Sequence, residues 1–490
     1  MNTAVIGSGF GGIASALRMR ALGHDVTLFE KLSEIGGRAQ VFNRGPYLHD
    51  AGPTVITAPY LFNELFELFD ENLEDHLDFR PLDPWYRYYF VDGFEFDYTP
   101  DSEKMISQIH DINPADVDNY QRMLKAAREI FEIGYVKLAD QPFHKFTTMM
   151  KYTPDIIRLK GYKSVYAFVA SFLKDPNLRK VFTIQPLLVG GNPFKTSAIY
   201  ALIQALEQKW GIYFCMGGMG KVIQELESLM LRHGIQIRKD TCIEKFSTVG
   251  KTISQIHTNS GEGLVFDNVI CNSDPVFVNT KLLKNKRVSF HNSYIKKFAK
   301  HSMGLFVIFF GSRKKFKKVA HHTIWMGPRY QSLLEDIFEK QVLADDFSIY
   351  LHRPTATDQS FAKNNGDSFY ALIPVPNMKS GIKWSDMKEE YALKVIGALN
   401  ETILPGINES IEDLFVMTPD DFKENYLTPY GSGFSISPIL SQSAWFRTHN
   451  KDDYYKNLYY SGAGSHPGAG VPGVLNSAKV VENIFINDKK

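Results

Sequence analysis

The sequence predicts an α/β fold in which a dinucleotide-binding domain with a parallel sheet is interrupted by a second domain. Three observations support this prediction. The chain begins with a strand-like run, a glycine turn and a helical pattern, and a similar unit ends it. Its 490 residues also exceed the size of one compact core. We therefore expect two or three domains, with both ends of the chain meeting in one of them.

The N-terminal unit has the spacing of a phosphate-binding turn. An apolar run at 2–6 leads into GSGFGG, which begins at Gly7, and a helical pattern follows. In a G-x-G-x-x-G turn Gly7 makes the tight bend, Gly9 lets the backbone approach a pyrophosphate, and Gly12 lets the helix lie close to the strand. A second strand-like run ends in Glu30, at the position where an acid binds ribose hydroxyls. This unit therefore predicts a Rossmann-type nucleotide site.

A second glycine pair follows and favours FAD over NAD as the nucleotide. Gly36 and Gly37 allow the backbone to pass beside a bulky cofactor, and Arg38 can neutralise a phosphate or brace the loop.

The last part of the chain supplies a matching unit. The run NLYYSGAGSHPGAGVPG, from Asn457, enters a glycine turn and then a helical pattern. We expect the pyrophosphate and ribityl chain at Gly462–Gly464 and the isoalloxazine beside Gly468–Gly473. FAD would thus be gripped from both ends of the chain.

Composition excludes several classes of partner and site. Lys and Arg total 55 against 54 Asp and Glu, so the net charge is +1 and no global field attracts nucleic acid. Cys215, Cys242 and Cys271 form no C-x-x-C motif, which argues against a zinc site or disulfide framework and favours a reducing compartment. No run approaches the roughly 20 apolar residues of a spanning helix, and no signal sequence precedes the first strand. We therefore expect a cytoplasmic protein.

The intervening chain alternates between helical and strand-like patterns. Residues 61–69 have helical spacing, 85–98 are strand-like and aromatic, and 114–210 are mostly helical and cut by prolines. Short strands that could extend the nucleotide-binding sheet are expected at 235–237, 242–243 and 265–271. Strands of a separate sheet are expected at 304–310, 346–351 and 368–375.

These patterns predict the domain boundaries. The FAD-binding domain is discontinuous and comprises 1–80, 212–290 and 440–490. The substrate-binding domain comprises 81–211 and 291–439, with a helical lid at about 100–200.

Several segments together carry a resemblance to a known family. They are the runs at 7–12, 36–38, 50–56 (DAGPTVI), 188–193 (LVGGNP), 442–447 (QSAWFR) and 462–473. With them the chain resembles, from Met1 to the C-terminal helix, a bacterial phytoene-desaturase-type carotenoid desaturase of the FAD-dependent carotenoid/retinoid oxidoreductase family. Ser465 and Tyr460 depart from the family pattern, and neither change should abolish flavin binding. The resemblance implies a glutathione-reductase-like Rossmann domain, an inserted α+β substrate domain and a helical, membrane-associated lid.

The motifs and the resemblance together assign the contacts of a noncovalent FAD. The expected cofactor-binding residues come from the N-terminal turn, the second strand, the second glycine pair, the 50–56 segment, the middle of the chain and the C-terminal block. They are Gly7, Gly9, Phe10, Gly11, Gly12, Glu30, Lys31, Gly37, Arg38, Pro53, Thr54, Val55, Ile243, Gly462, Ala463, Gly464, Gly470, Val471 and Pro472.

The resemblance implies an acyclic forty-carbon carotenoid as the substrate. Transfer of one CH₂ group out of water is favourable by about 0.8 kcal/mol. A forty-carbon polyene therefore has essentially no concentration in water and must be loaded from a membrane. This requires an apolar tunnel with a mouth on lipid, and thus peripheral association with the cytoplasmic membrane. The candidate mouth mixes apolar and basic residues: Phe143, Lys145, Phe146, Met149, Met150, Lys151, Tyr152, Ile156, Ile157, Arg158 and Lys160. The alternative for this segment is an ordinary helix pair that packs on its own domain. The run RKKFKK at 313–318 is a second candidate for the membrane-facing surface.

The implied reaction removes a hydride and a proton from neighbouring carbons beside the polyene, with flavin as hydride acceptor. Because the sequence has no Ser-His-Asp, paired-carboxylate or H-E-x-x-H arrangement, we expect positioning and a dry cavity to matter most. Asp50 and His466 are the candidate proton acceptors or flavin-tuning residues. The alternatives are a turn cap for Asp50 and a structural hydrogen bond for His466. We predict no metal site, because the adjacent His321 and His322 would point to opposite faces of a strand.

Several alternatives stay open at this point. The substrate is either phytoene, taken stepwise towards lycopene, or a 1'-hydroxylated later intermediate desaturated at its 3,4 bond. A flavin amine oxidase shares the N-terminal glycine motifs, but the C-terminal block has neither the covalent-flavin cysteine nor the aromatic cage usual there. A prenyl-binding protein of the Rab GDP-dissociation-inhibitor type shares the architecture without flavin. Oxygen or a quinone would reoxidise the flavin, and no motif distinguishes them.

Overall fold

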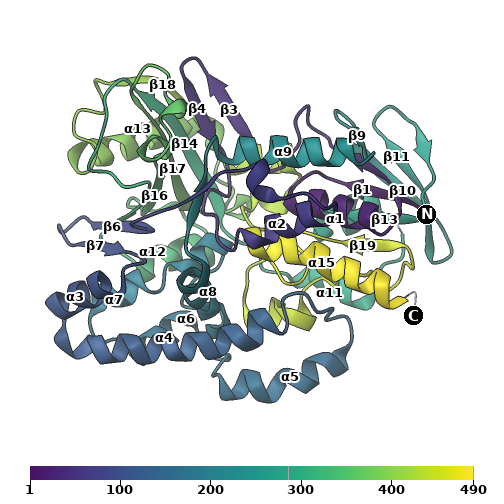
Figure 1. Cartoon of the computed structure of the whole chain (residues 1–490), viewed down its shortest axis with the longest axis horizontal. Coiled ribbons are helices and arrows are strands. Elements are labelled where there is room, and N and C mark those ends of the chain that lie inside the picture. Colours follow the sequence, from purple (N-terminus) through teal and green to yellow (C-terminus); the bar gives the residue numbers. More distant parts are fainter. Residues whose placement is uncertain (285, 489–490) are drawn as a thin grey trace.

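The computed structural model describes residues 1–284 and 286–488, arranged in two lobes. Figure 1 shows one lobe with a parallel sheet close to both termini, and a second lobe with a larger sheet and helix α13 (Trp384–Glu401) on its outer side. A row of helices runs along one edge of the molecule beneath both lobes. The two ends of the chain therefore meet in one lobe, as the sequence predicts.

The first lobe is built on a five-stranded parallel sheet with the order β19-β13-β1-β2-β9. These strands come from three separate parts of the chain: β1 (Asn2–Ile6), β2 (Asp25–Phe29), β9 (Gln236–Arg238), β13 (Asn268–Cys271) and β19 (Leu458–Tyr460). Because all pairs are parallel, the carboxyl ends of β1, β13 and β19 lie at the same edge of the sheet. The predicted domain boundaries stay a prediction, but the sheet does combine the two ends and the middle of the chain.

Each face of this sheet is covered. Along β1, Val5 faces a core made with helices α1 (Phe10–Ala21), α2 (Tyr60–Glu67), α9 (Gly218–Arg232) and α15 (Val471–Asp488). Ala4 and Ile6 face the other way, as strand alternation requires, into a core shared with β10 (Ile243–Val249) and β11 (Thr252–Thr258).

The expectation that the segment at 242–243 extends the nucleotide-binding sheet is wrong. Strand β10 begins at Ile243 and pairs antiparallel with β11, which pairs in turn with β12 (Gly263–Leu264). These strands form a sheet of their own, because β10 continues directly into a hairpin rather than crossing back over the parallel sheet.

The second lobe contains a seven-stranded sheet in the order β18-β14-β17-β16-β15-β6-β7. Three of its strands confirm the expected ones: β14 (Gly304–Ser312), β16 (Ile349–His352) and β17 (Asp367–Val375). The others are β6 (Tyr86–Phe90), β7 (Glu95–Tyr98), β15 (His322–Met326) and β18 (Ile411–Met417). Strand β14 is buried along its whole length, and α13 packs on one face through Trp384, Val395 and Leu399.

Two antiparallel two-stranded sheets and several further helices complete the lobes. The strand pairs are β3 (Val41–Arg44) with β4 (Tyr47–Asp50), and β5 (Phe79–Pro81) with β8 (Tyr213–Cys215). The helices are α10 (Pro275–Phe277), α11 (Phe290–Phe298), α12 (Gln331–Glu335) and α14 (Pro419–Tyr426).

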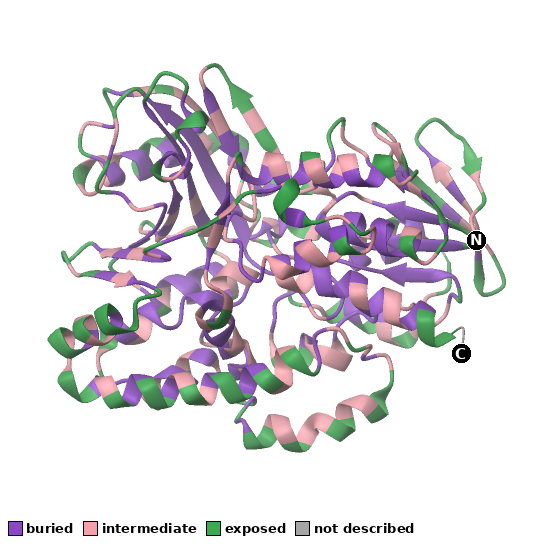
Figure 2. Ribbon diagram, in the orientation of Figure 1, coloured by how far each residue is buried: buried purple, intermediate pink, exposed green. Residues whose placement is uncertain are grey.

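The region from 102 to 210 is helical, as expected from its pattern. It contains α3 (Ser102–Ile112), α4 (Val117–Phe131), α5 (Phe146–Arg158), α6 (Val165–Ala170), α7 (Pro176–Val181) and α8 (Leu202–Trp210). Pro176 begins α7, where the missing N–H costs nothing, whereas Pro154 lies inside α5. Helix α5 contains no buried residue, and Figure 2 shows its ribbon in the colours of exposed and intermediate residues along the lower edge of the molecule.

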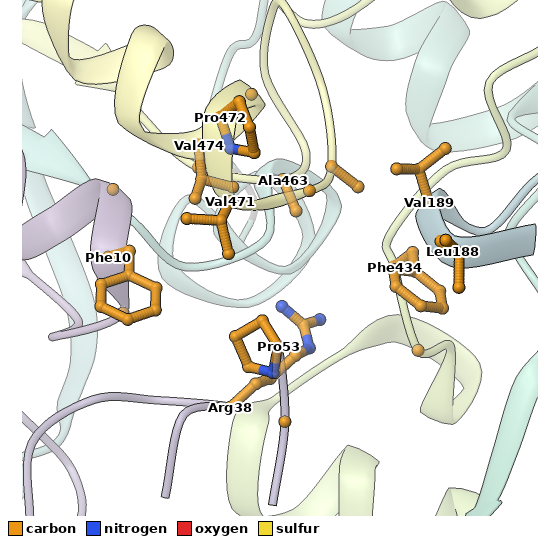
Figure 3. Close-up of a pocket in the computed structure, with 18 of the residues that line it drawn as sticks. Phe10, Arg38, Pro53, Leu188, Val189, Phe434, Ala463, Val471, Pro472 and Val474 are labelled. Atoms are coloured by element: carbon orange, nitrogen blue, oxygen red, sulfur yellow. The ribbon is translucent and has the colours of Figure 1, made fainter. Parts of the chain in front are cut away.

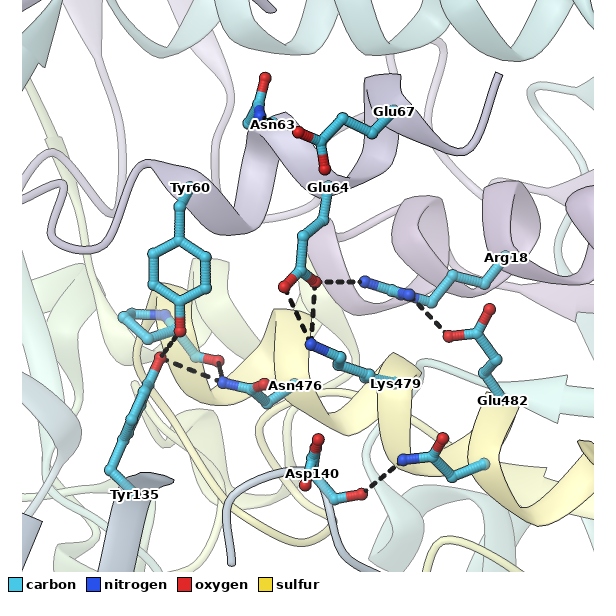
Figure 4. Close-up of polar contacts among 12 residues, drawn as sticks. Arg18, Tyr60, Asn63, Glu64, Glu67, Tyr135, Asp140, Asn476, Lys479 and Glu482 are labelled. Atoms are coloured by element: carbon cyan, nitrogen blue, oxygen red, sulfur yellow. Dashed lines mark hydrogen bonds and ion pairs between the residues drawn. The ribbon is translucent and has the colours of Figure 1, made fainter. Parts of the chain in front are cut away.

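A polar network joins this helical region to the parallel-sheet lobe (Figure 4). Glu64 of α2 pairs with Arg18 of α1 at 2.9 Å and with Lys479 of α15 at 2.9 Å. Beside it, the Tyr135 hydroxyl lies 3.2 Å from both the Tyr60 hydroxyl and the Asn476 amide nitrogen. The segment that follows α4 is thereby fixed against α2 and α15.

Candidate flavin site and the connected cavity

The N-terminal glycine turn has the tight geometry that its spacing predicts. Gly7 adopts a φ of 94°, a conformation that favours glycine, and leads into α1, whose N-cap is Gly9. A side chain on Gly12 would overlap the carbonyl oxygen of Gly7, because helix and strand are in backbone contact there. The N–H groups at the start of α1 thus lie at the carboxyl edge of the sheet, where a helix N-terminus favours an anion.

Glu30 is buried directly after β2 and supports this turn. Its carboxylate accepts hydrogen bonds from the Ser8 N–H at 2.9 Å and the Ser8 hydroxyl at 2.5 Å, and from the Leu32 N–H at 2.9 Å. Oε2 accepts both bonds from Ser8, whereas Oε1 accepts only the bond from Leu32 and keeps a further lone pair. Because Glu30 also lines the cavity described below, it can hold the turn and bind a ribose hydroxyl at the same time.

The C-terminal glycine turn meets the N-terminal one across Asn272. Gly462 has a φ of 109°, and its N–H donates to the Ser477 hydroxyl of α15 at 2.7 Å. The Asn272 amide donates to the Ser461 carbonyl at 3.0 Å, and a side chain on Gly9 would meet the Asn272 oxygen at 2.7 Å. The motifs did not indicate a role for Asn272. The available signal was its place after β13, since neighbouring parallel strands end at one edge.

Arg38 is the clearest sign of a bound anion at this edge. Its side chain points into the cavity between Pro53 and Ala463 (Figure 3). The Nε atom is buried and has no hydrogen-bonding partner among the described residues. Burial lowers the pKa of the Arg38 guanidinium, and the nearby Asp274 and Tyr426 raise it in part. A buried guanidinium whose Nε has no partner among the described residues, placed beside two glycine turns, fits a diphosphate, so these residues fit FAD.

One cavity of about 550 Å³ runs along these groups. It is lined by every expected cofactor residue except Gly12 and Gly464, namely Gly7, Gly9, Phe10, Gly11, Glu30, Lys31, Gly37, Arg38, Pro53, Thr54, Val55, Ile243, Gly462, Ala463, Gly470, Val471 and Pro472. Gly12 lies against Gly7, and a side chain on Gly464 would meet the ring of Pro275, so both glycines serve packing of the turns. Figure 3 shows Phe10 and Val471 facing Leu188, Val189 and Phe434 across the space.

The same cavity continues away from the glycine turns towards the helical region. There its lining is almost entirely apolar and includes Met149, Tyr152 and Ile156, which share one face of α5, together with Leu187 and Leu202. A dinucleotide-sized site and an apolar chamber are therefore parts of a single space.

Thr54 and Glu207 are buried polar residues in the wall of the cavity. The Thr54 hydroxyl lies 2.5 Å from that of Tyr370 and 3.0 Å from that of Tyr350. Glu207 of α8 accepts a hydrogen bond from Tyr86 at 3.3 Å, and burial raises the pKa of its carboxyl to about 8. At neutral pH Glu207 is therefore mostly uncharged, which is compatible with an apolar occupant.

Asp50 lies outside the cavity lining, at the start of α9. Both carboxylate oxygens accept a hydrogen bond from the Met219 N–H at 3.1 Å, and burial raises the pKa of this carboxyl to about 7. Asp50 therefore caps α9 rather than the turn at 50–54, because an acid at a helix N-terminus satisfies free N–H groups and the helix dipole. A role as proton acceptor stays a prediction.

His466 does line the cavity, next to the C-terminal glycine turn. Its Nε2 is 3.4 Å from the Leu138 carbonyl, while Nδ1 is buried without a partner among the described residues. Burial lowers the pKa of His466 to about 4, so the ring is neutral at physiological pH. The structural hydrogen bond expected as the alternative is present, and it reaches the segment after α4.

The expectation that His321 and His322 point to opposite faces of a strand is wrong. Strand β15 begins at His322, so His321 precedes the strand and does not follow its alternation. The two rings lie 4.6 Å apart between centroids, and both lie beside His352 of β16. All three are buried, and burial lowers the pKa of each imidazole.

Comparison with known proteins identifies the family. A model described as flavin containing amine oxidoreductase matches residues 10–481. The chain belongs to this family. It is 39% identical to the lycopene-forming phytoene desaturase of Pantoea ananas, over 99% of each chain. It is 36% identical to the neurosporene-forming phytoene desaturase of Rhodobacter capsulatus, over 98% of this chain and 93% of that relative.

Within the amine oxidoreductase family, these matches confirm the resemblance to the carotenoid desaturases and the flavin cofactor. The protein is an FAD-dependent oxidoreductase. Among solved structures, cyclohexylamine oxidase from Brevibacterium oxydans matches with a TM-score of 0.65 at 15% identity, over 100% of this chain and 99% of that one. An oxidoreductase from Methanosarcina mazei matches with a TM-score of 0.66 at 15% identity, over 99% of this chain and 100% of that one. Both support the flavin-binding α/β fold.

Proposed function

We propose that this protein desaturates phytoene, an acyclic forty-carbon carotenoid, in steps that extend its conjugated polyene. The observation that carries the proposal is the single cavity that joins two glycine turns to an apolar chamber. Similarity to phytoene desaturases over 99% of the chain supports it further. An amine oxidase or a prenyl-binding protein without flavin would not account for these relatives.

When bound, FAD supplies the hydride acceptor for this reaction. The glycine turns and Arg38 would hold its diphosphate, Glu30 its ribose, and the block at 468–473 its ring system. The chain itself would orient the polyene beside that ring and exclude water, which are the tasks that desaturation of an unactivated hydrocarbon requires.

His466 is the candidate proton acceptor, because it lines the cavity and its Nδ1 has no hydrogen-bonding partner among the described residues. A proton next to a delocalised allylic cation is strongly acidic, so even an imidazole of low pKa can accept it. Asp50, which caps α9, is assigned a structural role in this proposal.

We further propose that α5 and α11 form a docking surface on the cytoplasmic membrane. Phe146, Met150 and Ile157 are exposed on α5, beside the face of this helix that lines the chamber. The ring of Trp445 packs against those of Phe146 and of His291 in α11, with distances between ring centroids of 5.0 Å and 5.3 Å. This docking surface also carries exposed aromatic residues of α11 and basic residues of both helices: Phe290, Tyr294, Phe298, Lys145, Lys151, Arg158, Lys160, Lys296 and Lys297.

Helix α5 would then connect lipid with the chamber. Apolar and basic residues on one surface suit the interface of an anionic bilayer. Among the described helices, none combines the length and apolar character needed to cross a membrane. The second candidate, the run at 313–318, fits less well because Phe316 is buried and Lys314 bonds to the Pro405 carbonyl. Oxygen, or a quinone entering from the bilayer, would reoxidise the cofactor.

The test is product formation from liposomes. The FAD-loaded protein is incubated with anionic liposomes that contain phytoene or, separately, a 1'-hydroxylated carotenoid, and the pigments are separated by chromatography. We expect coloured products with longer polyenes from phytoene. Conversion of the hydroxylated carotenoid alone would replace phytoene by the second substrate, and conversion of neither would refute the proposal.

A further inference from the structure

His321, His322 and His352 form a compact buried cluster outside the cavity of the flavin site. His322 and His352 are directly paired across β15 and β16, so their side chains share one face of the sheet. His321, just before β15, turns onto the same face, and one ligand nitrogen from each residue lies within 4.8 Å of the others. The three residues come from two strands that the sheet holds in a fixed register.

Four ring nitrogens of the cluster are without a partner in the described part of the chain. Among the described residues, the Nε2 atoms of His321 and His322 and both ring nitrogens of His352 are buried without a hydrogen bond. Leaving such groups unsatisfied costs about 1–3 kcal/mol each. A group that binds several of these imidazole nitrogens at once would therefore stabilise the cluster.

The outer nitrogens are held by hydroxyl groups. His321 Nδ1 lies 2.7 Å from the Thr357 hydroxyl, and His322 Nδ1 lies 2.8 Å from the Tyr350 hydroxyl. Such second contacts fix ring orientation and leave the Nε2 lone pair for a metal. The charge of the neighbouring Arg353 is balanced, since its guanidinium lies 3.3 Å from Asp367.

We propose that these three histidines bind one divalent transition-metal ion, with Zn²⁺ as the fitting case. Imidazole suits such ions, and three histidines with one open position is an established zinc geometry. Zn–N bonds of about 2.0–2.1 Å place tetrahedral ligands about 3.3 Å apart. The ligand nitrogens, which lie within 4.8 Å of one another, therefore need to approach by up to about 1.5 Å, which side-chain rotation can supply.

The site would act on the wall of the cavity. The Tyr350 hydroxyl, which orients His322, also lies 3.0 Å from that of Thr54, and both residues line the cavity. A bound ion would fix β15 against β16 and with them this polar part of the wall. We assign it a structural role, independent of the desaturation chemistry.

The experiment measures metal binding by the FAD-loaded protein with its purification tag removed. The protein is treated with a chelator, titrated with Zn²⁺, and analysed for bound metal after gel filtration; Co²⁺ serves as a spectroscopic probe. We expect one equivalent of Zn²⁺ and visible bands of four-coordinate Co²⁺. Less than half an equivalent of Zn²⁺ would overturn the proposal and leave water as the occupant.

Matched variants locate the ion. His352→Ala should weaken Zn²⁺ binding by about 100-fold or more, and Thr357→Val, which removes only the outer contact of His321, by about tenfold. His110→Ala, on an exposed turn of α3, should bind like the unmodified protein. Flavin absorbance and circular dichroism check that each variant is folded. If His352→Ala is not folded, His352→Gln takes its place. Full Zn²⁺ binding by the folded His352 variant would overturn the proposal.

Discussion

The glycine turns and helix α5 lie at opposite ends of one cavity and are built in opposite ways. At the turns, backbone touches backbone: a side chain on Gly12 would overlap the carbonyl oxygen of Gly7, and one on Gly9 would meet Asn272 at 2.7 Å. Helix α5 has no buried residue and exposes Phe146, Met150 and Ile157.

This difference separates two kinds of specificity. A dinucleotide is recognised by the exact path of the backbone, so a single methyl group in a turn is costly. A lipid surface is recognised by summed apolar area and charge, so α5 tolerates single changes and responds to several at once. One cavity thus joins glycine turns that tolerate no added side chain to a helix that tolerates single substitutions.

Gly12→Ala should have the largest effect, because the added methyl group must separate α1 from β1. We expect the free energy of unfolding to fall by about 3 kcal/mol or more and most flavin to be lost. Thermal unfolding and flavin absorbance measure both. Gly397→Ala is the control, since a side chain there meets no atom within 4 Å. Equal stability of the two variants would contradict the claim that the glycine turns tolerate no added side chain.

The triple variant Lys145→Glu, Lys151→Glu and Lys160→Glu tests the proposed docking surface on α5. Each basic residue near an anionic bilayer contributes about 1 kcal/mol, so sedimentation with anionic vesicles should weaken by about 100-fold or more. Replacing Lys314, Lys315 and Lys317 by Glu is the control with the same charge change. If the control loses binding and the α5 variant keeps it, docking lies elsewhere.

Glu207→Gln tests the apolar chamber between the two ends. Burial raises the pKa of the Glu207 carboxyl from 4.5 to about 8, so the native state binds more protons than the unfolded state between these values. The contribution of Glu207 to stability should therefore fall as pH rises from about 4.5 to about 8 and level off above.

The Gln variant removes this dependence and keeps a hydrogen-bonding group for Tyr86. It should be more stable than the unmodified protein at pH 8 by about 2 kcal/mol, a value that allows for relaxation of the site. At pH 4 the two should be equal. Chemical denaturation at both pH values measures the difference, and an equal gain at both would show that charge is not the cause.

Glu30→Ala should have the smallest effect of the four. Ser8 keeps its backbone path but loses its carboxylate partner, and a ribose contact is removed. We expect FAD to dissociate about tenfold more readily, which corresponds to a charged hydrogen bond of roughly 1.4 kcal/mol. Glu34→Ala, at an exposed acid, is the control. Unchanged FAD affinity for Glu30→Ala would remove Glu30 from the site.

Local patterns predicted the elements that depend on neighbouring residues. The turn at Gly7–Gly12, the acid at Glu30 and the strand at 304–310 follow from spacing and periodicity over a few positions. Contacts across the sequence could not be predicted in this way. Asn272 bonds to a carbonyl 189 positions away, and Asp50 bonds to a helix start 169 positions away.

The histidine cluster was missed for a related reason. Alternation along a strand gives side-chain direction only after the first residue of the strand is known, and β15 starts at His322. The third member, His352, joins the cluster through strand pairing, which the sequence pattern does not specify.

The central claim is that one cavity holds FAD and a polyene side by side. The most direct test mixes the FAD-loaded protein with phytoene liposomes in the absence of oxygen and quinone and follows the flavin absorption. We predict that the absorption of oxidised flavin is bleached as coloured polyene forms, and that empty liposomes have no effect. Flavin that stays oxidised in the presence of phytoene would contradict the account.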